Sequence, residues 1–283
     1  MAVMERLTAI AKDRQARVVF PEMDDPRVAE ACDKLQSEGL CRPIGLSDPQ
    51  DHHVAALVEA RGLKEAVARR MLARPLFMAS AMVATGEADA MVAGADSPTK
   101  KVIEAAAIVV GLQDGVSTPS SFFLMLMPDG RELIFADCAV NVAPDAGQLA
   151  DIANASVGSC KALLGDPRVA MLSFSTGNSG AGASVDLVRK ACELSGFAGP
   201  VQADAALNPI IGSKKGYDAG RANVLIFPSL DAGNIAYKLV QELGGAQALG
   251  PFLQGFKRPV CDLSRGASVE DIVSATVVTV AMG

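Results

Sequence analysis

Tryptophan is absent from the sequence, and aromatic residues make up only 4% of its 283 positions. We therefore do not expect a platform on which bases or sugars stack. Basic residues are fewer than acidic ones, 26 against 32, so neither nucleic acid nor an anionic membrane is an expected partner. No apolar run reaches the roughly 18 residues of a membrane-spanning helix without a charge or a turn signal.

Histidine is also scarce, since the chain has only the adjacent pair His52 and His53. The six cysteines show no CxxC spacing. A zinc site built from histidine and cysteine is therefore not expected, and we predict no metal site. We interpret the cysteines as buried, reduced thiols of a cytoplasmic protein. The first 20 residues carry charges within their apolar stretch and resemble no signal peptide.

The chain does contain ample material for a core, because 50% of its residues are hydrophobic. Short apolar runs alternate with longer amphipathic segments. Residues 16–22 predict a buried strand, and residues 25–39 predict a helix with Asp25 as its cap and Pro26 at its first position. Repeated strand–helix alternation predicts parallel βαβ units and an α/β fold. Further strands are expected at 41–46, 88–95, 120–128 and 132–140, and further helices at 51–72, 74–86 and 97–112, the last capped by Ser97.

The segments 120–128 and 132–140 are joined by an Asp-Gly turn, which predicts a β-hairpin. We expect the chain to pass between two α/β halves near this hairpin. The predicted first domain is 1–141, possibly completed by 263–283, and the predicted second domain is 142–262. Ligands of such folds bind where loops leave the carboxyl ends of strands.

One such loop is SFSTGNSGAGASVDLV (173–188), which follows a predicted strand and precedes a predicted helix. Its small residues let the backbone approach a ligand, and the start of the helix offers free N–H groups to an anion. No lysine follows the glycines, so the loop matches neither a P-loop nor a dinucleotide motif. The alternative interpretation is an ordinary glycine-rich turn.

A second loop, AGADSPTKK (93–101), places Lys100 and Lys101 near a helix start. Positive charge at that end opposes the helix dipole. The two lysines therefore either face solvent, which is slightly favoured, or bind an anion.

The stretch DLSRGASVEDIV (262–273) combines Ser264 and Arg265 with an acid, Asp271. Arginine presents a planar set of donors suited to phosphate or to a developing oxyanion. Asp271 is a candidate general base, but Ser268 three residues before it also predicts a capping box. On the pattern alone the capping box is favoured. None of these patterns identifies a reaction.

Longer blocks of the sequence resemble the phosphate acetyltransferase family, of which phosphate butyryltransferases are close relatives. The resemblance rests on VVFPEMDDPRV, VAMLSFSTGNSGAGASVDLVRKA, QADAALNP, ANVLIFPSLDAGNIAYKLVQ and GPFLQGFKRPVCDLSRGASVEDIV. It implies reversible acyl transfer between an acyl phosphate and coenzyme A, which is a substrate and not a prosthetic group. It also implies a homodimer and no metal. The implied fold has two three-layer α/β domains with a cleft between them, like isocitrate and isopropylmalate dehydrogenases.

The same resemblance implies roles for individual residues. Asp271 corresponds to the base that takes the proton of the coenzyme A thiol, so that the thiolate attacks the acyl carbonyl directly. Arg265 corresponds to the residue that binds phosphate, and Ser264 to a hydrogen-bonding neighbour of the thiol. The expected substrate contacts are Ser175, Thr176, Gly177, Ser179, Gly180, Lys100 and Lys101.

Three alternatives remain open at this point. The first is an acyltransferase whose transferred group is expected to be acetyl, with propionyl and butyryl as the alternatives. The family commonly has an arginine early in the helix that follows AGA, and this chain has Ile103 at that position. A non-catalytic domain that senses acyl-coenzyme A is therefore a second hypothesis. A dehydrogenase of the same fold is a third, which the chain supports least, because it shows no matching set of metal-binding acids.

Overall fold

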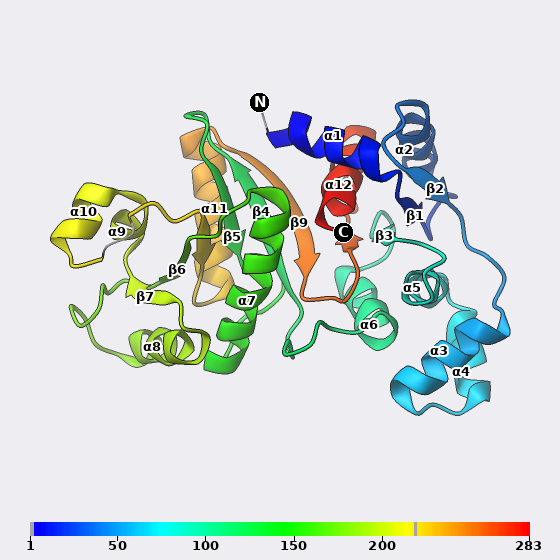
Figure 1. The fold of residues 1–283 in the computed structure, drawn as a ribbon, viewed down its shortest axis with the longest axis horizontal. Coiled ribbons are helices and arrows are strands. Elements are labelled where there is room, and N and C mark those ends of the chain that lie inside the picture. The colour runs from blue at the N-terminus through cyan, green and yellow to red at the C-terminus, as the bar shows by residue number, and fades with distance from the viewer. Residues whose placement is uncertain (1–2, 218–219) are drawn as a thin grey trace. The chain divides into compact units, whose positions relative to one another are not determined.

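The computed structural model describes residues 3–217 and 220–283 (Figure 1). The chain divides into two compact units, residues 1–114 with 256–283 and residues 115–255. We call these the first and the second unit. The division places hairpin residues 120–140 with the second unit, whereas the sequence-based boundary at 141 placed them with the first.

The sheet of the first unit has the strand order β2 (Arg42–Ile44), β1 (Arg17–Val19), β3 (Ala90–Ala93) and β10 (Val260–Asp262). All of its described pairings are parallel, as the strand–helix alternation predicts. Every residue of β3 and β10 is buried, which explains why these strands are apolar runs without alternation. The sequence analysis missed β10, which has only three residues.

Helices pack around this sheet in two groups. One group is α1 (Val3–Arg14), α2 (Pro26–Ser37) and α12 (Val269–Met282), and the other is α3 (Asp51–Arg61), α4 (Glu65–Leu72), α5 (Pro75–Ala84) and α6 (Thr99–Val109). The predicted start of α2 is confirmed, because the Asp25 side chain accepts a hydrogen bond from Arg27 N and Pro26 is the first helical residue. The single helix predicted over 51–72 is wrong, because Gly62 adopts a left-handed conformation that ends α3.

The second unit has the strand order β9 (Gln247–Gln254), β4 (Ser120–Leu126), β5 (Glu132–Ala136), β8 (Val224–Ile226), β6 (Val169–Leu172) and β7 (Ala198–Val201). The predicted hairpin is confirmed as the antiparallel pair β4–β5, and β9 adds a second antiparallel pairing with β4. The pairings β5–β8, β8–β6 and β6–β7 are parallel. The carboxyl ends of these four strands therefore share one edge.

The described residues of this unit also form the helices α7 (Ala146–Leu163), α8 (Ala183–Ser195), α9 (Ala203–Leu207), α10 (Pro209–Lys214) and α11 (Leu230–Gly244). One core cluster joins Phe123, Phe135, Leu172 and Phe227 to partly buried residues of α9, α10 and α11. The short helices α9 and α10 were not predicted. Among the described residues, no helix combines the length and the apolar character needed to cross a membrane.

Candidate active site

Three loops meet at the carboxyl edge of the first unit's sheet, because β1, β3 and β10 run parallel. The closest approach is at Gly94, directly after β3. A Cβ atom there would lie 2.6 Å from both Asp262 Oδ1 and Leu263 N. Gly94 also has a φ of +107°, which side-chain-bearing residues rarely adopt. Only glycine fits where these two loops touch.

Glu22 organises the loop between β3 and α6. Its Oε2 accepts hydrogen bonds from Gly94 N and Ala95 N, both at 2.8 Å, and its Oε1 accepts one from Ser97 N at 2.8 Å. A carboxylate that bonds three main-chain donors fixes the path of the loop. The predicted cap at Ser97 is wrong, because α6 begins after Pro98 and no side chain caps it.

Arg27, in the first turn of α2, binds the other two loops together. Its Nη1 donates to the main-chain oxygens of Arg265, at 2.8 Å, and Ala267, at 3.0 Å. Its Nη2 donates to Ala95 O at 3.1 Å and to Asp25 Oδ2 at 2.6 Å. The planar guanidinium can serve several acceptors at once. It therefore holds the loop that carries Arg265 against the loop that follows β3.

Asp262 is the last residue of β10, and its side chain is only 3% exposed. Its Oδ2 accepts a hydrogen bond from Thr99 Oγ1 at 2.5 Å. Its Oδ1 is buried without a hydrogen-bond partner among the described residues. Burial raises the pKa of this carboxyl to about 6; the charge of Glu22 adds to the rise and the bond from Thr99 opposes it.

The predicted catalytic residues lie in the segment that follows Asp262 in the chain. Ser264, Arg265 and Asp271 are all exposed, and Ser264 Oγ accepts a bond from Gly266 N at 3.3 Å. The predicted capping box is confirmed: Asp271 Oδ2 accepts bonds from Ser268 N, at 2.9 Å, and Ser268 Oγ, at 2.7 Å. Within the described part of the chain, Asp271 Oδ1 makes no hydrogen bond, so one carboxylate oxygen is left for other chemistry.

The two candidate lysines lie at the start of α6, and both are exposed. Lys101 forms an ion pair with Glu104 at 3.0 Å. No described residue forms an ion pair with Lys100. The start of α6 is connected to the end of β10 by the bond from Thr99 to Asp262. Lys100 is therefore the better placed of the two to bind an anion.

The candidate loop of the second unit joins β6 to α8 and is tied together by its own hydroxyls. Gly180 N donates to the buried Ser175 Oγ at 2.8 Å, and Thr176 N donates to Ser179 Oγ at 3.0 Å. Gly177 N donates to Pro200 O at 2.9 Å. Helix α8 begins at Ala183, and its N-cap residue, Gly182, has no side chain to cap it. Its first N–H groups thus stay open to a ligand.

A second loop at the edge shared by β5, β6 and β8 is held by Asp137, which is 2% exposed. Its carboxylate accepts bonds from the main-chain N–H groups of Ala139, Val140 and Asn141 and from the hydroxyl of Ser121. This loop was not among the sequence-based candidates.

Known proteins with similar sequences decide the family. Residues 48–280 match the phosphate acetyl/butaryl transferase family. The phosphate acetyltransferase of Paracoccus denitrificans is 37% identical, and the match covers 99% of this chain and 98% of that protein. The chain belongs to the phosphate acetyl/butaryl transferase family. The phosphate acetyltransferase of Nitrosomonas europaea is 40% identical over 97% of this chain, but the match covers only 45% of that longer protein. The chain thus spans about half the length of several curated relatives.

Solved structures agree with this family membership. A phosphotransacetylase from Streptococcus pyogenes has a TM-score of 0.91 and 35% identity, covering 99% of this chain and 97% of that one. A protein described as a 4-hydroxythreonine-4-phosphate dehydrogenase from Salmonella typhimurium has a TM-score of 0.51 and 14% identity, covering 95% and 99%. The latter likeness concerns the fold alone and agrees with the predicted dehydrogenase-like α/β architecture. The predicted cleft between the units stays a prediction.

For this family member, sequence reasoning missed the residues that support the candidate site, namely Glu22, Arg27, Thr99 and Asp262. Glu22 and Arg27 lie within VVFPEMDDPRV, one of the blocks that carry the resemblance. The available signal for Glu22 was a charged residue at the end of the predicted strand 16–22. No such signal was available for Asp262, because the strand that it ends was not predicted.

The family member also has a cluster that the sequence did not suggest as a metal site. His52, His53 and Glu87 place their ligand atoms within 4.8 Å of one another. However, Gln50 N donates to His53 Nδ1 at 3.1 Å, so the ring's proton belongs on Nε2, where a metal would have to bind. Burial lowers the pKa of His53, which favours this neutral form. We therefore interpret the cluster as a hydrogen-bonded group, with Glu87 Oε1 2.6 Å from His52 Nε2.

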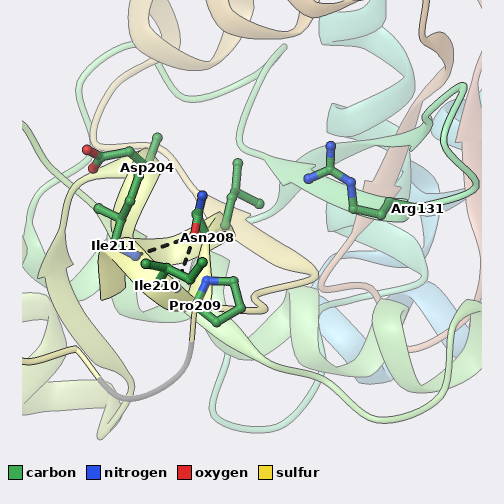
Figure 2. A pocket seen from close by; sticks show the side chains of 8 residues that line it. Arg131, Asp204, Asn208, Pro209, Ile210 and Ile211 are labelled. Atoms are coloured by element: carbon green, nitrogen blue, oxygen red, sulfur yellow. Dashed lines mark hydrogen bonds between the residues drawn. The ribbon is translucent and has the colours of Figure 1, made fainter. Parts of the chain in front are cut away.

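A pocket of about 560 Å³ lies in the second unit, beside α9 and α10. Figure 2 shows Arg131 on one side of it and Asp204 and Asn208 on the other. Asn208 caps α10 by accepting from Ile210 N, and Arg131 pairs with Asp129. Because these polar groups already have partners, we assign no function to this pocket.

Proposed function

We propose that this protein transfers an acetyl group reversibly between acetyl phosphate and coenzyme A. The observation that carries the proposal is the match to a phosphate acetyltransferase of nearly the same length, which covers 99% of this chain and 98% of that relative. Coenzyme A is a substrate in this proposed reaction, which calls for no prosthetic group.

In the proposed mechanism, Asp271 takes the thiol proton and the thiolate attacks the acetyl carbonyl. The new bond joins sulfur to the carbonyl carbon, and the bond from that carbon to the phosphate oxygen breaks, so phosphate leaves with the electron pair. A thiol with a pKa of about 8.5 is mostly protonated at neutral pH, so a base raises the fraction of thiolate. The free Oδ1 of Asp271 supports this role, because the capping box uses only Oδ2.

Arg265 binds the phosphoryl group in this proposal, and Ser264 hydrogen-bonds to the thiol. Among the described residues, no side chain forms an ion pair with the guanidinium of Arg265. The main-chain oxygen of Arg265 accepts a hydrogen bond from Arg27, which fixes the loop. An unpaired guanidinium carried on a fixed main chain suits an oxyanion that gains charge in the transition state. Lys100 and Lys101 are proposed to add positive charge.

The loop of the second unit is proposed to contact the substrates through Ser175, Thr176, Gly177, Ser179 and Gly180. Its uncapped helix start supports this assignment. Ser175 and Ser179 act mainly on the loop itself, since their hydroxyls lie 3.2 Å apart and accept its main-chain donors. Gly177 is the residue of this set with the most room for a ligand, because no heavy atom of the described residues beyond its chain neighbours lies within 4 Å of the place a Cβ would take there. The hydroxyl of Thr176 already bonds to Gln202.

The test of this function is an assay for free thiol with acetyl-, propionyl- and butyryl-coenzyme A, with and without phosphate. Thiol release that requires phosphate supports the proposal, and the three rates rank the acyl groups. A faster rate with propionyl or butyryl would replace acetyl in the proposal. Binding of acetyl-coenzyme A without turnover would favour the sensing domain instead.

The role of Asp271 is tested separately. We expect Asp271→Asn to lower turnover about 10²- to 10⁴-fold, because the amide cannot accept the thiol proton. Its carbonyl oxygen can still accept from Ser268 N, so the helix start is preserved. Glu270→Gln is the matched control, since Glu270 is exposed and pairs with Lys34. Equal activity of the two variants would leave Asp271 as a helix cap only.

We further propose a homodimer in the cytoplasm. Helix α11 supports dimerisation, because Ile235, Leu239 and Leu243 form a stripe with exposures of 57%, 51% and 83%. We expect Leu239→Glu to shift the mass measured by light scattering to that of a monomer, and Leu194→Glu on α8 to leave it unchanged. A monomeric wild type would contradict the dimer. The cytoplasmic location is supported by the cysteines, which are all free in the described residues.

A further inference from the structure

Asp262 has a combination of features that the proposed mechanism leaves unused. It ends the strand that precedes Ser264 and Arg265, and its side chain is 97% buried. One oxygen has no partner among the described residues, and the other accepts the hydroxyl proton of Thr99. A buried carboxylate with too few hydrogen-bond donors lowers the stability of the fold unless it takes up a proton, so its presence calls for an explanation.

Thr99 connects this buried group to the surface. It is the first residue of α6, it is exposed, and Lys100 follows it. A hydroxyl has one proton to donate and can accept two bonds. When Asp262 is ionised, Thr99 gives that proton to the carboxylate and presents only lone pairs outward. When Asp262 is protonated, the carboxyl can donate to Thr99, whose own proton is then free to point outward.

We propose that Asp262 is a positioning residue which decides, through Thr99, whether the hydroxyl at the start of α6 donates a hydrogen bond to a bound anion. This inference rests on the proposed function, in which the anion is the phosphate group of the substrate. Binding of the anion is therefore coupled to the uptake of one proton by Asp262. The main-chain N–H groups at the start of α6 and the ammonium of Lys100 complete a surface that favours negative charge.

The surroundings of Asp262 make this exchange possible in the neutral range. Burial raises the pKa of its carboxyl to about 6. Of the titratable groups around it, Glu22 adds to this rise, and burial raises the pKa of the adjacent Cys261 to about 12, which keeps that thiol neutral. Glu22 is itself bound to three main-chain N–H groups, so it cannot take over the bond to Thr99.

The test measures binding of sulfate by calorimetry between pH 5.5 and 7.5. Sulfate keeps its double negative charge over this range, so any proton taken up belongs to the protein. Titrations in two buffers of different ionisation enthalpy count that proton. For the wild type we expect the uptake of a proton near pH 6.5, and an affinity for sulfate about 10-fold tighter at pH 5.5 than at pH 7.5. A change of this size corresponds to about one hydrogen bond to a charged group.

Three variants separate this inference from a merely structural role. Asp262→Asn places an amide donor next to Thr99, so it should bind sulfate tightly at every pH without proton uptake. Thr99→Val removes the hydroxyl and should bind weakly at every pH. Thr99→Ser keeps the hydroxyl and should restore the pH dependence. If Asp262→Asn fails to fold, the pair of Thr99 variants decides the question.

Several results would overturn the inference: no sulfate binding to the wild type, the same proton uptake in Asp262→Asn, or an unchanged pH dependence in Thr99→Val. Turnover is measured separately on the same proteins. If the predicted pattern of sulfate binding appears without phosphate-dependent turnover, the proposed function fails and the inference stands. If turnover is present and the pattern is absent, only the inference fails.

Discussion

Replacing Glu22 by glutamine tests how much the loop between β3 and α6 depends on one carboxylate. The wild-type side chain accepts three main-chain hydrogen bonds at 2.8 Å, two on Oε2 and one on Oε1. Glutamine has the same shape but only one acceptor oxygen. If that oxygen takes the place of Oε2, two bonds remain without their ionic character, and the NH₂ group faces Ser97 N. A donor then meets a donor, and one main-chain N–H loses its partner.

The magnitude follows from these losses. A hydrogen bond to a charged group contributes about 1.5–3 kcal/mol, and an unpaired donor that water reaches only in part costs at least about 1 kcal/mol. We therefore expect Glu22→Gln to lower the free energy of unfolding by roughly 2–4 kcal/mol. Because Glu22 also fixes Gly94, which touches Asp262, turnover should fall as well.

Urea unfolding followed by circular dichroism measures the stability, with slope and midpoint fitted together. Glu104→Gln is the control, since it removes a half-buried carboxylate whose ion pair among the described residues is with Lys101 on the same helix, and we expect an unchanged midpoint. A loss below about 0.5 kcal/mol for Glu22→Gln would refute the reasoning, because three bonds to a buried loop cannot be worth so little.

Three further predictions concern the same edge of the sheet. Gly94→Ala should lower the free energy of unfolding by about 3 kcal/mol or more, because the new Cβ would meet Leu263 N at 2.6 Å. Gly86→Ala is the control and should lower it by only about 1 kcal/mol, since Gly86 also has a positive φ but has open space around it. Equal urea midpoints for the two variants would contradict this. Arg27→Lys should lower turnover about 10-fold, because lysine cannot serve acceptors on two loops, and an unchanged kcat would contradict the proposed positioning. Asp262 has a folded-state pKa of about 6, above its ordinary 3.8, so it binds more protons when folded, and its own contribution to the free energy of unfolding should fall as pH rises from about 4 to 6. Relative to Asp262→Asn, that loss should reach about 3 kcal/mol, and parallel stability curves would refute it.

Local patterns in the sequence predicted the features that depend on neighbouring residues. The cap of α2 at Asp25 and the capping box of Ser268 and Asp271 span two or three residues, and both are present. Alternating strands and helices predicted the α/β fold for the same reason, since each element carries its own periodicity. The hairpin β4–β5 followed from its Asp-Gly turn.

The supports of the candidate site could not be predicted in this way. Glu22 bonds to residues 72 to 75 positions later, and Thr99 bonds to Asp262 across 163 positions. Such contacts exist only once parallel strands bring their carboxyl ends to one edge. The same cause explains the wrong cap at Ser97, whose N–H group Glu22 engages. The charge of Glu22 at the end of the predicted strand 16–22 was visible in the sequence, but its partners were not.

Two carboxylates at this edge of the sheet, Glu22 and Asp262, differ in their burial and in the number of donors that they bind. Glu22 is only partly buried and is met by three main-chain donors, so its charge is well compensated and the loop around it is fixed. Asp262 is more deeply buried and has one donor, the hydroxyl of an exposed threonine. A fold that needed Asp262 only for stability would do better with an amide or an apolar residue there. The shortage of donors therefore favours the protonated form of Asp262, and the sulfate titrations test directly whether anion binding is coupled to that proton.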